Sequence, residues 1–131
     1  MYLLDTDPII YSLKGNQRVM DALARHADAP KAISVITFGE LIFGARRSRH
    51  VQENLAKVYR IKEMLPVIDI TPAIMECFGE LKAELKQKGT SVADLDLMIG
   101  ATALTLGYSI VTNNVRHLSK IPGLSVENWS A

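Results

Sequence analysis

The chain has 131 residues, 48% of them hydrophobic, which excludes intrinsic disorder and is enough for one domain, expected over residues 1–131. Its formal net charge of +1 excludes a strong overall attraction to nucleic acid, so any basic binding surface must be local. Cys77 is the only cysteine, which excludes an internal disulfide, and no membrane-spanning run or basic leader is present, so we expect a soluble cytoplasmic protein with no membrane partner.

Short runs rich in β-branched residues alternate along the chain with longer segments of helical periodicity. Strands are expected at residues 1–4, 31–36, 67–70 and 109–112, with a fifth inside 124–129. Helices are expected from about residue 8, around 19–23, and over 38–45, 51–65, 72–88 and 94–106. Because strands that alternate with helices form βαβ units, the sequence predicts an α/β fold with a central parallel sheet of about five strands flanked by helices.

Capping residues mark the helix after residue 70 most clearly. Thr71 is a good N-cap, Pro72 occupies the first helical position, and Gly89 supplies a C-terminal cap. The apolar segment that follows ends in the same way at Gly107. Both helices are therefore predicted from local chemistry alone.

Polar residues fall where the predicted strands end. They are Asp5 and Asp7 after the first strand, Glu40 in the first turn of the next long helix, Asp94 and Asp96 in the first turn of a later helix, and Asn113 and Asn114 after the fourth strand. In a parallel sheet these points meet at one edge, where ligands bind. Carboxylates that converge without basic partners repel one another, and oxygen ligands with an amide among them suit Mg²⁺ or Mn²⁺.

Each of these residues also has a structural interpretation. We interpret Asp7 as the N-cap of a helix that begins at Pro8, whereas Asp5 has no such role. Glu40 lies off the apolar stripe of its helix, which fits a solvated glutamate as well as a ligand. Asp96 begins a helix that is apolar nearly all round, so we expect it to be buried and functional. The two asparagines also fit a simple turn.

Four blocks form a series along the chain: YLLDTD at 2–7, SVITFGEL at 34–41, VADLDLMIGATALTLG at 92–107 and IVTNNVRHLSKIPGLSVENW at 110–129. Together, and in this order, they resemble PIN domains and more narrowly the VapC-type toxins of bacterial toxin–antitoxin pairs. The resemblance extends over essentially the whole chain. It implies a parallel α/β sheet and the cleavage of RNA with Mg²⁺ or Mn²⁺ held by a cluster of acids.

The resemblance also implies roles for individual residues. The family's acidic positions fall on Asp5, Glu40 and Asp96, and its fourth position falls on Asn114, where many PIN domains carry an aspartate. The first and third of these acids would hold the metal ion, and Glu40 would orient the attacking water or hold a second ion. Asn114 would bind the water shell of the metal, and Thr112 matches a family hydroxyl near the site.

The family resemblance further implies three partners: an RNA substrate, with structured RNAs such as transfer RNA favoured, a cognate VapB-type antitoxin, and a second copy of the chain in a homodimer. Arg46, Arg47 and Arg49 supply positive charge at the end of the helix that carries Glu40. They fit contacts to RNA phosphates or to an acidic partner segment, and equally a structural role at the helix C-terminus.

Other interpretations of the acidic residues remain open from sequence. The D-x-D after the first strand also resembles haloacid-dehalogenase-like phosphatases, which need a lysine before the late acids, and Lys88 lies at a loose spacing. A receiver-like signalling domain would use Asp69 as its phosphoacceptor. Such a domain requires a lysine after the last strand, and none is present there. A PIN-like protein that binds RNA without cutting it is a third alternative.

Overall fold

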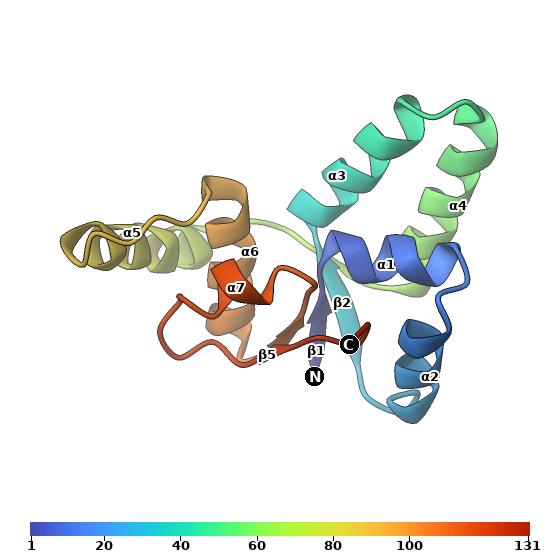
Figure 1. The fold of residues 1–131 in the computed structure, drawn as a ribbon. Helices are drawn as coiled ribbons and strands as arrows, with labels where there is room; N and C mark the ends of the chain where they lie inside the picture. The colour runs from blue at the N-terminus through green and yellow to red at the C-terminus, as the bar shows by residue number, and fades with distance from the viewer.

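The computed structural model describes residues 1–131 and has a five-stranded sheet between two layers of helices (Figure 1). The strands are β1 (Tyr2–Leu4), β2 (Lys31–Ser34), β3 (Val67–Ile68), β4 (Ser109–Val111) and β5 (Val126–Glu127). They lie in the order β3-β2-β1-β4-β5, and every neighbouring pair is parallel. The predicted parallel α/β fold with about five strands is confirmed.

Seven helices cover the two faces of this sheet. They are α1 (Thr6–Leu13), α2 (Gln17–Arg25), α3 (Val35–Arg46), α4 (Val51–Met64), α5 (Pro72–Gln87), α6 (Asp94–Leu106) and α7 (Val115–Leu118). Residues of α1 to α4 form the core on one face, and residues of α5 to α7 form it on the other. None of the helices combines the length and the hydropathy needed to cross a membrane.

The central strands are buried on both faces, which explains why they read as continuous apolar runs. Leu3 and Ile110 pack in the core beneath α5 and α6, whereas their neighbours Leu4 and Val111 pack in the core beneath α1, α3 and α4. Adjacent residues of a strand point to opposite faces, so two consecutive leucines supply both layers. This packing fixes where β1 and β4 end, and hence where the polar residues that follow them lie.

The caps predicted for α5 and α6 are confirmed. The Thr71 hydroxyl accepts a hydrogen bond from the Ile74 amide at 3.3 Å, and Pro72 begins the helix. Gly107 caps α6 with φ of 71°, in the left-handed region that glycine adopts without strain.

The predicted starts of two other helices are wrong. The second strand ends at Ser34 rather than at residue 36, because the Ser34 hydroxyl accepts a hydrogen bond from the Thr37 amide at 3.0 Å and caps α3. Helix α1 begins at Thr6 rather than at Pro8. Proline is tolerated in this first turn because the first four amides of a helix have no partner inside it.

Candidate functional site

A pocket of about 320 Å³ opens at the carboxyl-terminal edge of the sheet, beyond the ends of β1 and β4. No hydrophobic residue lines it; its lining consists of Asp5, Thr6, Asp7, Glu40, Asp96, Asn113 and Asn114. The structure thus brings together the four positions at which a site was predicted, from the turn after β1, from α3, from α6 and from the turn after β4. Residues up to 109 positions apart in the chain share this acidic pocket.

Asp5 lies at the floor of the acidic pocket and is only 8% exposed. One carboxylate oxygen accepts a hydrogen bond from the Thr6 amide at 2.9 Å, and the other accepts one from the Thr112 hydroxyl at 2.8 Å. Asp5 is therefore the N-cap of α1, and the prediction that Asp7 fills this role is wrong. Thr112 is buried and also accepts a hydrogen bond from the Asn114 amide at 2.9 Å, so it ties the end of β1 to the turn after β4.

Glu40 faces the acidic pocket from the second turn of α3, not from the first turn as predicted, because that helix begins earlier. It is half-buried, and its Oε1 accepts a hydrogen bond from the Thr6 hydroxyl at 2.6 Å. Glu40 is therefore a carboxylate held by a hydrogen bond and not a freely solvated one. Its second oxygen has no partner within the chain.

Asp96 is held by a chain of hydrogen bonds from the turn after β4. Its Oδ2 accepts from the Asn114 amide nitrogen at 3.1 Å, and the Asn114 side-chain oxygen lies 2.6 Å from Nδ1 of His117. Because a carboxylate only accepts, the amide nitrogen must face Asp96 and the oxygen must face His117, whose Nδ1 then carries the proton. Asp96 itself is half-buried rather than fully buried as expected, since it lies in the open first turn of α6.

The surroundings of Asp5 and Asp96 in the acidic pocket disfavour the charged forms of both carboxyl groups. Burial, together with the charges of Glu40 and Asp96, raises the pKa of Asp5 from 3.8 to about 6, against the hydrogen bonds from Thr112 and Thr6, which lower it. Burial likewise raises the pKa of Asp96, and the charge of Asp7 adds to this rise. A group whose charged form is disfavoured in this way, inside a cleft, is typical of a functional site.

No lysine or arginine of the chain neutralises the acidic pocket. The two ion pairs of the structure lie elsewhere and join Lys82 to Asp94 at 3.0 Å and Lys88 to Glu84 at 3.1 Å. No group of three or more His, Cys, Asp or Glu side chains encloses a metal ion unaided. The carboxylate oxygens still fit Mg²⁺ or Mn²⁺, because such ions bind through one or two carboxylates and keep several waters.

One residue that lines the pocket, Thr6, was not singled out from the sequence. Asn113, which was, donates a hydrogen bond from Nδ2 to Ser130 at 2.9 Å, which attaches the C-terminal segment to the site. His117 reaches the site only through Asn114. The contacts of Thr6 with Glu40 and of Asn113 with Ser130 join residues 34 and 17 positions apart, so no short pattern predicts them, whereas His117 and Asn114 are only three positions apart. Asp94, in contrast, points away into its ion pair with Lys82.

The predicted basic contact residues lie outside the acidic pocket. Arg46 is the last residue of α3, Arg47 caps that helix, and Arg49 follows it; all three are exposed. The Arg47 guanidinium lies 5.7 Å from the centre of the Phe43 ring. This end of α3 points away from the sheet (Figure 1), whereas Glu40 lines the acidic pocket.

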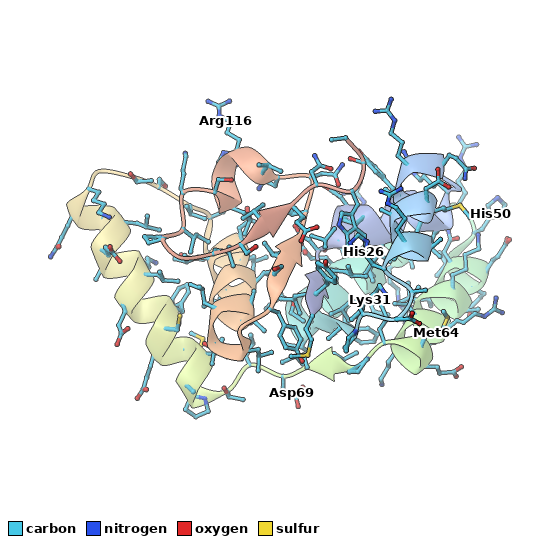
Figure 2. All side chains as sticks on the ribbon, turned by 90° about the horizontal axis from the view of Figure 1, so that it is seen from below. His26, Lys31, His50, Met64, Asp69 and Arg116 are labelled. Atoms are coloured by element: carbon cyan, nitrogen blue, oxygen red, sulfur yellow. The ribbon has the colours of Figure 1, made fainter.

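Two alternatives from the sequence analysis conflict with the structure. Lys88, which the phosphatase interpretation needs near the acids, pairs with Glu84 at the end of α5. Asp69, the phosphoacceptor of the receiver interpretation, is exposed and points outward from the edge of the sheet (Figure 2). The strand order also differs from the 2-1-3-4-5 order of receiver domains.

Comparison with known proteins adds an independent line of evidence. The sequence profile of the PIN domain family matches residues 2–124. Ribonuclease VapC2 of Haemophilus influenzae is 35% identical over 98% of this chain and 97% of its own length. The tRNA(fMet)-specific endonuclease VapC of Salmonella typhimurium is 35% identical with the same coverage. A crystal structure of VapBC2 from Rickettsia felis, bound to a DNA fragment from its promoter, is similar with a TM-score of 0.90 at 32% identity, covering 98% of both chains.

Proposed function

This chain belongs to the PIN domain family and, within it, to the VapC ribonucleases, and on that premise we propose that it is an endoribonuclease toxin that cuts RNA in the acidic pocket with a bound divalent metal ion. The observation that carries the proposal is the convergence of Asp5, Glu40 and Asp96 on one polar pocket that no lysine or arginine enters. We assign the whole of residues 1–131 to this one domain.

The residues divide the chemistry between holding the ion and positioning water and substrate. Asp5 and Asp96 hold the metal ion, which we propose to be Mg²⁺ or Mn²⁺. When bound, such an ion lowers the pKa of a coordinated water and polarises a phosphate oxygen. Glu40, fixed by the Thr6 hydroxyl, offers its free oxygen to orient the attacking water. Asn114 fixes the rotamer of Asp96 and would also bind the water shell of the metal, as the family resemblance implies.

Substrate and partner follow from the names of the relatives. The Salmonella typhimurium relative is named for cleavage of tRNA(fMet), so we propose transfer RNA as the substrate class, which the chain would meet in the cytoplasm. The Rickettsia felis structure is of a VapBC complex, so we propose a VapB-type antitoxin as the inhibiting partner. A homodimer remains a prediction, which light scattering of the purified chain tests.

Cleavage assays with a matched pair of variants test the proposed function. The chain, refolded free of any partner, is incubated with transfer RNA in the presence of Mg²⁺, Mn²⁺ or EDTA. The Asp96→Asn variant removes a proposed ligand, whereas Asp94→Asn changes an exposed, ion-paired residue of the same helix turn. We expect metal-dependent cleavage by the chain and by Asp94→Asn, and a loss of at least a hundredfold in Asp96→Asn. Equal cleavage by the two variants would refute the assignment.

A further inference from the structure

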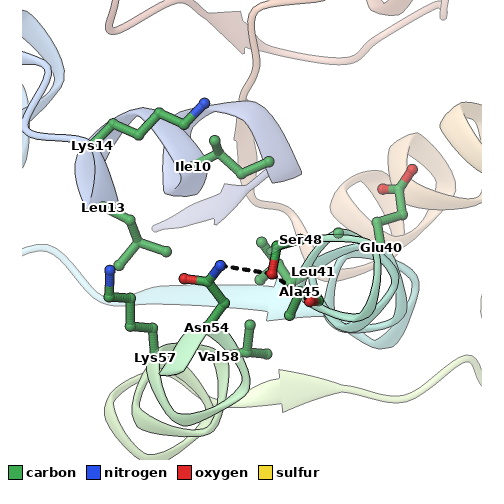
Figure 3. Close-up of a pocket in the computed structure, with 11 residues that line it drawn as sticks. Ile10, Leu13, Lys14, Glu40, Leu41, Ala45, Ser48, Asn54, Lys57 and Val58 are labelled. Atoms are coloured by element: carbon green, nitrogen blue, oxygen red, sulfur yellow. Dashed lines mark hydrogen bonds between the residues drawn. The ribbon is translucent and has the colours of Figure 1, made fainter. Parts of the chain in front are cut away.

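A second pocket lies beside the acidic pocket, between α1, α3 and α4 (Figure 3). Its volume is about 340 Å³, and Glu40 lines both pockets, so the two are neighbours. Its walls are largely apolar and include Ile10, Leu13, Leu41, Ala45 and Val58. A concave, mostly apolar pocket with a few placed polar groups is the usual form of a small-ligand site.

Two cationic side chains line this pocket. Lys14 caps α1 and Lys57 projects from α4; in Figure 3 the Lys57 ammonium lies on the side of the pocket opposite Glu40, and the Lys14 ammonium lies over α1. Neither forms a salt bridge or a side-chain hydrogen bond, unlike Lys82 and Lys88. Positive charge without an anionic partner thus flanks an apolar cavity that adjoins the proposed catalytic site.

One polar group inside the second pocket is fixed in orientation. Asn54 donates a hydrogen bond from Nδ2 to the Ser48 hydroxyl at 2.8 Å, and that hydroxyl donates to the Ala45 carbonyl at 2.7 Å. The Asn54 side-chain oxygen is left without a donor and lies on the side of Leu13 and Lys57 (Figure 3). A preset acceptor of this kind suits the amino or imino hydrogens of a nucleobase.

We propose that this pocket binds a nucleotide of the RNA next to the phosphate that is cut. The base or ribose contacts the apolar wall, Asn54 accepts a hydrogen bond from the base, and Lys14 and Lys57 contact backbone phosphates. This inference rests on the proposed function, and it names residues that bind substrate outside the acidic pocket. It also answers how a chain with a net charge of only +1 holds RNA against a cluster of acids: the positive charge is local and sits beside them.

Charge and shape favour RNA over other occupants. Phosphate complements both lysines, and the flat face of a base complements the apolar wall, so a single nucleotide satisfies every feature of the pocket at once. Ser48 also lines the pocket and is flanked in the chain by Arg47 and Arg49, so further positive charge lies nearby. An acidic protein segment would pair with the lysines without using the Asn54 oxygen, and the Asn54→Leu variant distinguishes the two occupants.

The experiment compares three variants with a matched control in steady-state cleavage of RNA. Lys14→Gln and Lys57→Gln each remove one charge, and Asn54→Leu removes the fixed acceptor. Lys86→Gln is the control, because Lys86 is an exposed, unpaired lysine of α5 that lines neither pocket. Each assay is repeated over a range of salt concentrations, the cut sites are mapped on a randomised RNA, and Mn²⁺ binding is measured separately for every protein.

We expect KM to rise roughly threefold to tenfold in each pocket lysine variant, with kcat changing less and the slope of log KM against log salt falling by about 0.7. Asn54→Leu should broaden the nucleotide preference at a position next to the cut. The pocket variants should bind Mn²⁺ as tightly as the unaltered chain does. The Lys86→Gln variant should match the unaltered chain in KM, kcat and nucleotide preference. If the unaltered chain cuts RNA but the pocket variants behave as Lys86→Gln does, the nucleotide site is refuted while the proposed function stands. If Asn54→Leu keeps the nucleotide preference of the unaltered chain and the lysine variants keep its KM, the occupant is not a nucleotide and the inference is wrong.

Discussion

Replacing Asp5 by Asn should stabilise the metal-free protein at neutral pH, although it removes a residue central to the site. The rise of the Asp5 pKa from 3.8 to about 6 corresponds to about 3 kcal/mol, since one pKa unit is about 1.4 kcal/mol. The charged carboxylate costs the folded state this amount at pH 7.5. Asparagine avoids that cost and still accepts the Thr6 amide, but it leaves the Thr112 hydroxyl without an acceptor, a loss of about 1 kcal/mol. The expected net gain is about 2 kcal/mol.

The gain must depend on pH with a definite sign. A carboxyl group whose pKa is raised by folding holds its proton longer in the folded state, so the stability of the unaltered chain falls as pH rises from about 4 to about 6 and is then level. The advantage of Asp5→Asn should therefore be complete above pH 7 and absent at pH 4, where the lost hydrogen bond leaves the variant no more stable than the unaltered chain.

Urea unfolding in EDTA at pH 7.5 and at pH 4 measures the gain in stability of Asp5→Asn and its dependence on pH. The same experiment with Mn²⁺ at pH 7.5 measures how much the metal stabilises each protein. The metal should stabilise the unaltered chain and have little effect on Asp5→Asn. Asp94→Asn is the control and should shift the free energy of unfolding by less than about 0.5 kcal/mol at either pH, because its ion pair is exposed. A variant that is less stable than the unaltered chain at pH 7.5, or a gain that does not change with pH, would refute the reasoning.

Three further changes probe the groups around the acids. His117→Ala should lower kcat about tenfold, because it releases Asn114. His117→Asn keeps a donor at the Nδ1 position and should restore most of the rate. Equal loss in both variants would show that the hydrogen bond is unimportant. Thr6→Val removes the hydroxyl that holds Glu40 but keeps the amide that donates to Asp5. RNA cleavage should therefore fall several-fold, with a change in the free energy of unfolding of about 1 kcal/mol or less. An unchanged cleavage rate contradicts this role of Thr6. Thr71→Ala should cost about 1 kcal/mol in a thermal melt and leave cleavage unaltered, since this cap lies far from the pocket.

Local chemistry accounts for the parts of the fold that the sequence predicted well. The caps at Thr71 and Gly107 depend on side chains and backbone angles within a few residues, so a short stretch of sequence is enough to predict them. The strands around Leu3 and Ile110 are apolar because both faces of a parallel sheet are covered. The convergence of the acids then follows from topology, since parallel strands all end at the same edge.

What the sequence did not predict depends on contacts between distant segments or on a competition between nearby caps. Asp7 precedes a proline and looks like a helix start, but Asp5 accepts the Thr6 amide and begins the helix two residues earlier. The β-branched residues after Ser34 favour a longer strand, yet the serine hydroxyl ends it. The orientation of Glu40 depends on a partner 34 residues away, which no local pattern reveals.

Calorimetric titration of Mn²⁺ into the metal-free chain most directly tests the central claim, that the acids of this pocket hold a divalent metal ion. This measurement does not require a known RNA. The claim predicts that the unaltered chain and Asp94→Asn bind the ion with the same affinity, and that Asp5→Asn and Asp96→Asn each bind it at least tenfold more weakly. If Asp96→Asn binds Mn²⁺ as well as Asp94→Asn does, the ion is not held by the acids that converge at the end of the sheet, and the account of the site is wrong.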